Sequence, residues 1–462
     1  MLGATSLVAV LLAAPTCGPL DLPTAQALAV ARSEEVAIRR SEVAEAEADR
    51  AVARGIRWLP EFNTTVTGGV VPGARLKPDP ATGVVDPNNV TSIESGSNRG
   101  LSELGPFMRV EVNALQPLWT WGRISAAGEA SDAVAQARGK LLRSSSDAIR
   151  HRVVGLVMGI RLLNKLLGIA GDVENALKDV DARVQKSLKA NDGEISPEDR
   201  YRIELFRSDL TEAKAEVERR LRIGRVGLAA TLALEVDQLQ LKEEPLPDTG
   251  SIVEPDLAQA KADAERLRPD LNALDSGIQA KEAQSKATWA EMFPQVGLVG
   301  QFAWSRAPGR DTVTNPYVGD FFNALTIGGA LVIKQNLSFW NVAARANKVD
   351  AELRTLRESR RAALRGIEVQ VEEAIANLHA AIVKRNATAK AVAAGRSWFR
   401  SATLNFGVGV GESRDLIDAY RGYVEAQRSD AQATLDLLVA DDRIREVTGR
   451  TPPDPVLNCV MP

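Results

Sequence analysis

The chain has 462 residues and a formal net charge of −3, so no excess of positive charge indicates a nucleic acid partner. Aromatic side chains make up only 5% of the residues, too few to fill several thick cores, which favours thin seams between helices. Two cysteines, Cys17 and Cys459, and two histidines leave little material for a metal centre or a zinc hydrolase, and we expect no metal and no cofactor.

The N-terminus carries an apolar run over residues 2–14. Its length is that of a signal-peptide core and too short to span a bilayer as a helix. It predicts export, with residues 1–18 as the leader, although no basic residue precedes the run. Lipidation of Cys17 is an alternative left open, although the residues before it lack the usual leucine and small-residue pattern.

The next segment predicts a helix and two strands. Residues 24–58 form a helix that Thr24 can cap and Pro60 ends. A strand follows over residues 61–71, and the Gly-, Pro- and Ser-rich residues 73–105 are expected to form an exposed loop. The second strand alternates: Met108, Val110, Val112 and Ala114 point one way, and Arg109, Glu111 and Asn113 the other.

A segment without proline then runs from Pro117 to Pro197. Its Ala, Leu, Arg and Lys content predicts one helix, and about 70 residues at 1.5 Å each give a rod on the order of 100 Å long. An ordinary globular domain cannot bury such a rod. A break around Gly193 leads into a shorter helix over residues 198–241.

The same order of elements recurs downstream. A helix over residues 256–291, interrupted near Pro269, leads to a strand from Gln295, a loop over 306–318 and a strand over 324–337. A second long helix and a helix over 413–447 complete the copy. The long helix carries a coiled-coil seam of Leu364, Ile367, Val371, Ala374, Leu378 and Ala381.

The two copies are offset by 219 residues, which indicates an internal repeat. We divide the mature chain into a first repeat, residues 19–250, a second repeat, residues 251–449, and a tail, residues 450–462. The residues that align across the offset are Gln116 with Gln335, Leu118 with Leu337, and Trp121 with Trp340.

The four predicted strands have the length and the two-residue period of transmembrane β-strands. Four strands cannot close a barrel, and open edges are not tolerated in hydrocarbon, so spanning a membrane requires several copies of the chain. Two soluble hairpins capping a coiled coil are the alternative. The aromatic residues at the strand-to-helix junctions favour the membrane, because they stand where an interfacial belt would lie: Trp119, Trp121, Phe339 and Trp340.

With this architecture the chain resembles the outer-membrane efflux protein (TolC) family over nearly its full mature length. The resemblance rests on the doubled layout and on the order of degenerate motifs. These are the Gln-x-Leu-x-x-Trp segments before each long helix, Arg268-Pro269-Asp270-Leu271, and Phe406-Gly407-Val408-Gly409 followed by Asp415-Leu416.

The resemblance implies a mainly α-helical fold whose long helical hairpins form an α-barrel tunnel through the periplasm. It also implies a homotrimer in which each chain gives four strands to one twelve-stranded β-barrel in the outer membrane. Such a protein conducts substrates passively as the exit duct of a tripartite efflux pump or a type I secretion system. Its implied partners are a periplasmic adaptor protein, an inner-membrane transporter and outer-membrane lipid.

The resemblance also implies a periplasmic entrance ringed by Asp415 and Asp418, which share a helix face. Threefold symmetry would gather these carboxylates into a constriction that favours cations. The alternative is that both are first-turn acids stabilised by the helix dipole. Gly411 stands where some members carry a basic residue that helps hold the entrance shut.

The turns between paired helices are the implied adaptor contacts: Gly193, Phe406, Gly407, Val408, Gly409 and Gly411. The glycine pattern follows a helix with no strand before it, which favours a helix-ending turn over a phosphate cradle. His151 and His379 lie within the long helices without a catalytic constellation, so we expect no enzyme. A periplasmic coiled-coil adaptor or spacer outside the membrane is the alternative function.

Overall fold

The computed structural model describes residues 19–88, 97–190, 197–408 and 410–451. The predicted leader with Cys17, the turn residues Gly193 and Gly409, and most of the C-terminal tail lie outside the described residues. The chain divides into two compact units, which are described separately. One comprises Met1–Ala44, Ala137–Asp275 and Glu358–Pro462, and the other Glu45–Gln136 and Ser276–Arg357, as far as these are described.

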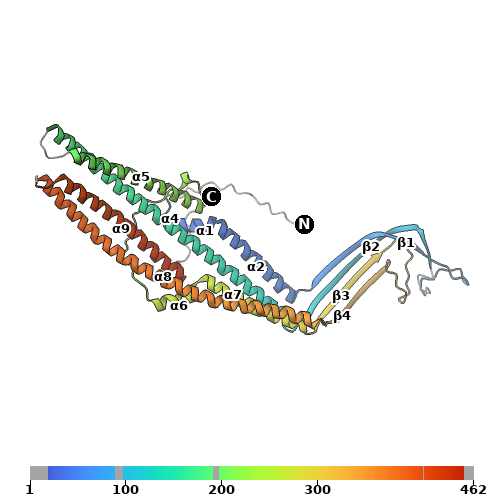
Figure 1. Cartoon of the computed structure of the whole chain (residues 1–462). Coiled ribbons are helices and arrows are strands. Elements are labelled where there is room, and N and C mark those ends of the chain that lie inside the picture. The colour runs from blue at the N-terminus through green and yellow to red at the C-terminus, as the bar shows by residue number, and fades with distance from the viewer. Residues whose placement is uncertain (1–18, 89–96, 191–196, 409, 452–462) are drawn as a thin grey trace. The chain divides into compact units, whose positions relative to one another are not determined.

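The elements follow in the predicted order, twice over, and the fold is mainly helical with four antiparallel strands, as expected (Figure 1). The first half contains α1 (Leu22–Arg32), α2 (Glu34–Trp58), β1 (Glu61–Leu76), β2 (Ser97–Trp119), α4 (Arg123–Ala190), α5 (Pro197–Thr231) and the 3-10 turn η1 (Val236–Gln238). The second half contains α6 (Leu257–Leu267), α7 (Pro269–Trp289), the 3-10 turn η2 (Ala290–Met292), β3 (Gln295–Arg306), β4 (Ala324–Lys334), α8 (Phe339–Gly407) and α9 (Ser413–Thr448).

The helical unit is held by narrow seams of small and branched apolar residues. The predicted seam of α8 is buried against α6, α7 and α9, and each fully buried aliphatic side chain contributes about 1.5–3 kcal/mol. A second seam joins α1, α4 and α5. The two seams include Ile367, Val371, Ala374, Leu378 and Ala381 in the first, and Leu28, Ile149, Val153, Leu228 and Leu232 in the second.

Three helix boundaries differ from the sequence prediction. The first helix is capped by Asp21, whose carboxylate accepts a hydrogen bond from the Thr24 amide at 2.9 Å, so Thr24 is not the cap. Ser33 takes an extended conformation and separates α1 from α2. The helix expected to reach residue 241 ends at Thr231, because the chain turns back and Leu20 donates to the Gln240 carbonyl at 2.7 Å.

The first two strands are longer than predicted. β1 continues to Leu76 and β2 begins at Ser97, so the connecting segment is shorter than the loop expected over residues 73–105. Glycine and proline suggested a loop there, but a register shift between Pro72 and Gly73 lets the ladder accommodate them. The last strand ends at Lys334 rather than residue 337.

Within the described residues, one helix, α4, contains a stretch long and apolar enough to cross a membrane. Composition alone is weak evidence, because the core helix of a helical protein passes the same test. Ile149, Val153 and Val157 from α4 pack in the seam with α1 and α5. We therefore assign α4 to helical packing.

The four strands form one antiparallel sheet in the order β1-β2-β3-β4. The two repeats meet in this sheet, because β2 of the first pairs with β3 of the second, from Met108 opposite Arg306 to Trp119 opposite Val296. Among the described residues, β1 and β4 each pair with a single neighbour. The sheet therefore has two open edges.

Candidate functional site

The sheet has one apolar and one polar face, as the alternation predicted. Residues paired across an antiparallel ladder lie on the same face, so each row of partners can be followed from β1 to β4. Two rows of the apolar face are Val66-Val110-Trp304-Leu325 and Thr64-Val112-Phe302-Ile327. Two rows of the polar face are Thr65-Glu111-Ala303-Thr326 and Asn63-Asn113-Gln301-Gly328.

Among the described residues, nothing covers the apolar face. Ile327 is 74% exposed and Leu325 64% exposed, values that are costly for a sheet face in water. Shielding such a face from water within one chain would require a layer of helices or strands packed on it. No described helix packs there. The arrangement suits a sheet that faces hydrocarbon.

Glu111 is the centre of a polar cluster on the opposite face. Its carboxylate accepts hydrogen bonds from Asn113 at 3.0 Å and from Gln301 at 3.2 Å. Arg109 reaches the same carboxylate at 3.3 Å. Because these groups satisfy one another, Arg109 and Glu111 form a paired polar cluster on the face that can line water.

The predicted interfacial aromatics lie where the strands join the helices. Trp119, Trp121, Phe339 and Trp340 are all more than two-fifths exposed. Trp121 has a left-handed backbone with φ +52, and its indole nitrogen donates to the Pro294 carbonyl at 2.7 Å. This bond ties the junction of one repeat to the junction of the other.

The sequence analysis missed other aromatics at the same level. Phe293 lies 5.2 Å from the Trp121 ring, and Trp58 is 75% exposed at the end of α2. Phe293 stands directly before Pro294 and Trp58 two residues before Pro60, and we treated each proline only as a helix end. The aromatic residue before each proline was the signal that could have extended the belt.

The two predicted aspartates lie on the first turns of α9 and are exposed. Asp418 has a basic neighbour, because Arg414 approaches its carboxylate at 3.8 Å. Glu412 at the N-cap adds a third exposed acid that the sequence analysis did not single out. Each chain therefore presents three acids and one base at this end of α9.

The turn between α8 and α9 is tight. The amides of Val410 and Gly411 both donate to the Asn405 carbonyl at 3.0 Å. A Cβ at Gly411 would lie 3.0 Å from the Asn405 backbone, so a larger residue would disturb the turn. Val408 and Val410 are 73% and 83% exposed, and Phe406 is partly buried.

Next to this turn, α9 packs on the first helical hairpin. Ile417, Tyr420 and Val424 contact a cluster of Val173, Leu177 and Ile203 from α4 and α5. Burial, with the nearby charge of Asp172, raises the pKa of Tyr420 to about 12, so its hydroxyl stays neutral. The spacing of these three α9 residues is the helical period, and it was the signal in the sequence for this contact.

Comparison with known proteins gives a consistent result. A family model described as outer membrane efflux protein matches residues 261–450. The matched segment covers most of the predicted second repeat, and this part of the chain resembles the outer membrane efflux protein family. Members of that family are outer-membrane channels and not enzymes, and the match supports the same location and class for this chain.

Solved structures of outer-membrane channels share the fold of this chain. The outer-membrane channel OprN superposes with a TM-score of 0.72 at 17% identity, covering 93% of this chain and 89% of that chain. The Neisseria gonorrhoeae MtrE outer membrane channel, in its open state, gives 0.71 at 16% identity, with 93% and 88% covered. The Vibrio cholerae outer membrane protein VceC gives 0.69 at 14% identity, with 93% and 96% covered. A search of curated proteins found no match.

The two histidines make contacts within the helical unit. His151 is nearly buried in α4, and its Nδ1 lies 2.9 Å from Asp442 of α9. His379 is 65% exposed and lies 2.9 Å from Glu254. Among the described residues, no group of acids, cysteines and histidines is arranged to hold a metal.

Proposed function

We propose that this protein is the exit duct of a tripartite efflux pump or a type I secretion system and works as a homotrimer. Three copies of the four-stranded sheet would join edge to edge into a twelve-stranded barrel, with the apolar face toward lipid. The long helices would continue the passage through the periplasm. The observation that carries the proposal is a two-faced sheet with two open edges, because neither edge tolerates hydrocarbon unpaired.

The helix turns would meet a periplasmic adaptor, which in turn would engage an inner-membrane transporter. The exposed side chains of Val408 and Val410 give this end an apolar contact surface. The belt of Trp119, Trp121 and Trp340 would lie at the membrane interface. The adaptor or spacer outside the membrane is set aside, because the family consists of outer-membrane channels.

The acids at the start of α9 would form the periplasmic aperture. Threefold repetition of Asp415 and Asp418 would concentrate negative charge on a narrow passage and favour cations. The exposure of both side chains supports this role, since a buried or fully paired carboxylate could not act on a passing ion.

Neighbouring residues of β4 provide a matched test. Ile327 lies on the apolar face and Thr326 on the polar face. A lysine facing lipid near the middle of the bilayer costs about 2–4 kcal/mol, whereas one facing water costs little. We expect Ile327→Lys to reduce the amount of heat-modifiable trimer in outer-membrane fractions severalfold, and Thr326→Lys to leave it near the wild-type amount.

Equal loss in the two variants would contradict the assignment of the faces. A wild-type mature protein that is monomeric and freely soluble without detergent would contradict the duct itself. Conductance of the purified wild-type trimer in planar lipid bilayers completes the test, since a closed barrel without a water passage would carry no current.

A further inference from the structure

The connection between β3 and β4 does not stay beside its own hairpin. The Asp311 amide donates to the Ala74 carbonyl at 2.9 Å, and a parallel bridge pairs Ala74 with Arg310. Ala74 belongs to β1, which is separated from β3 by β2. The connection, residues 307–323, must therefore cross β2 to reach β1. We call these residues the strap.

The crossing takes place on the polar face of the sheet. A Cβ added at Gly105 would lie 3.4 Å from the Cα of Gly309. The strap backbone therefore lies over the face of β2 to which position 105 belongs. Residues two apart on a strand share a face, and the register is continuous from Gly105 to Glu111. The strap therefore covers the face that carries Arg109 and Glu111.

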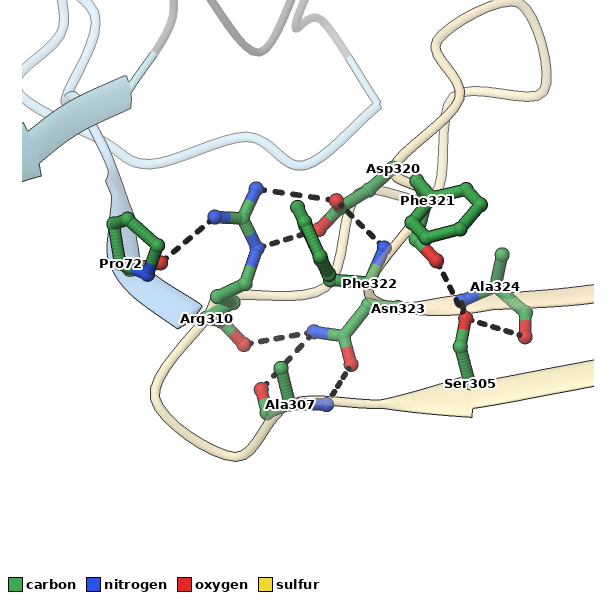
Figure 2. A network of polar contacts seen from close by, with 9 residues as sticks. All are labelled: Pro72, Ser305, Ala307, Arg310, Asp320, Phe321, Phe322, Asn323 and Ala324. Carbon is green, nitrogen blue, oxygen red and sulfur yellow. Dashed lines mark hydrogen bonds and ion pairs between the residues drawn. The ribbon is translucent and has the colours of Figure 1, made fainter. Parts of the chain in front are cut away.

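A buried ion pair fixes the fold of the strap. Arg310 binds both carboxylate oxygens of Asp320 at 3.1 Å, and its third nitrogen donates to the Pro72 carbonyl of β1 at 2.8 Å (Figure 2). Both side chains are 5% exposed. One guanidinium thus joins the two ends of the strap to the strand on the far side of β2.

Aromatic contacts press the strap onto the polar face. Phe322 meets Phe107 of β2 edge to face at 5.0 Å, and the Arg310 guanidinium lies 5.0 Å from the Phe322 ring. The Phe321 ring lies 4.3 Å from the guanidinium of Arg109. Phe107, Val71 and Ala307 form a buried cluster around these contacts. An ordinary exposed hairpin loop would have no such core.

We propose that the strap is an inward-folded constriction at the outer mouth of the duct, and that Arg310 is the residue that holds it there. The inference rests on the proposed function, in which the polar face lines the water passage and the end away from the helices faces outward. Three straps would narrow the mouth. Because Arg310 pairs with Asp320 and Asp311 pairs with Arg75 of β1, the strap would select cargo by size rather than by charge.

The test measures access to the passage from outside intact cells. Thr65 pairs with Glu111 on the polar face, so a Thr65→Cys reporter would lie below the strap. A small methanethiosulfonate and a bulky polymer-linked maleimide are applied, and labelling of the parent chain, which has Cys17 and Cys459, is subtracted. Tyr317→Cys, 94% exposed on the strap, is the positive control.

Two variants release the strap by different means. Arg310→Ala removes the ion pair, and Gly105→Val inserts atoms where the strap backbone lies without changing charge. In the wild-type background we expect the small reagent to label Thr65→Cys at least tenfold faster than the bulky one. Either release variant should raise the rate of the bulky reagent by at least tenfold, with the amount of heat-modifiable trimer unchanged.

The outcomes separate the two proposals. A bulky-reagent rate that is the same in wild type and in a release variant with intact trimers overturns the strap and leaves the duct standing. Failure of even the small reagent to reach Thr65→Cys in a release variant, while Tyr317→Cys is labelled, overturns the water-filled passage and the strap with it.

Discussion

The backbone of Gly449 lies against Arg268: a Cβ at position 449 would be 2.8 Å from the Arg268 amide nitrogen and 2.8 Å from the Leu267 carbonyl carbon. Gly449 caps α9 in the left-handed conformation, with φ +70. The end of α9 therefore packs directly against the backbone of the residues where α6 ends and α7 begins. A residue with a side chain meets both a strained backbone and a steric clash at this point.

Gly449→Ala is therefore expected to destabilise the helical unit by about 2–4 kcal/mol, of which the left-handed backbone accounts for about 1 kcal/mol and overpacking for the rest. The measurement is the urea midpoint of the helical circular dichroism signal. Gly83→Ala is the matched control, because Gly83 has φ +69 but nothing within 4 Å of its added Cβ. Equal small shifts in both variants would show that the contact with Arg268 does not constrain α9.

The order of elements was predictable because periodicity reports which face is buried. The alternation from Met108 to Ala114 fixed the two faces of β2, and the seam from Ile367 to Ala381 fixed the packed face of α8. Both patterns are local, and the structure confirms them. The break at Ser33 did leave a trace that we did not use, since serine favours helix N-caps and Glu34 and Glu35 follow it in the first turn of α2.

Features that depend on distant partners were not predictable. Residues 73–76 open the Gly-, Pro- and Ser-rich segment that predicted a loop, yet they form part of β1, where the Leu76 amide donates to the Asp311 carboxylate of the strap at 2.9 Å. The two aspartates of α9 were found by resemblance. Arg414 is a local exception, since it lies four residues before Asp418 on the same helix and its spacing was a signal that the sequence already held.

The charge at the start of α9 can be tested in single channels. Replacing both Asp415 and Asp418 with Asn is expected to lower the cation preference, seen as a reversal potential closer to zero in a salt gradient. The difference should shrink at about 1 M salt, where the Debye length falls to about 3 Å. Glu425→Gln on the same helix is the control, because that acid is paired with Arg428 at 2.5 Å. Unchanged selectivity in the double variant would favour a helix-dipole role for the two acids.

The contact of α9 with α5 combines an aromatic and an ionic part. Arg421 lies 4.9 Å from the Phe206 ring and 3.4 Å from the Asp209 carboxylate, and Phe206 meets Tyr420 edge to face at 6.3 Å. The Arg421 side chain is 40% exposed and that of Asp209 70% exposed, so solvent screens the ion pair. The aromatic part should dominate the stability of the contact.

Phe206→Leu is accordingly expected to cost about 1–2 kcal/mol, from the lost ring pair and the lost cation–π contact. Asp209→Asn is expected to cost no more than about 0.5 kcal/mol. Urea midpoints of the two variants measure the difference. A cost for Asp209→Asn as large as that for Phe206→Leu would mean that the ionic part holds the helices together.

The last prediction concerns the dependence of stability on pH. Burial lowers the pKa of His151, but its hydrogen bond to the Asp442 carboxylate and the charges of Asp442, Glu446 and Asp147 together raise the pKa above its ordinary value. Arg150 beside it is itself paired with Asp147 at 2.6 Å. A raised folded-state pKa means that the stabilisation is complete below the unfolded pKa of about 6.5 and is lost as the pH rises through the folded value.

His151→Gln should therefore cost about 1–2 kcal/mol at about pH 6, where the imidazolium bonds Asp442, and clearly less at about pH 9. Urea midpoints of wild type and variant at the two pH values give the difference. His379→Gln is the control, since His379 also contacts a carboxylate but is 65% exposed, so that its ion pair is screened. A cost of His151→Gln that is equal at the two pH values would mean that a neutral imidazole makes the contact, and that the link between α4 and α9 does not respond to acid.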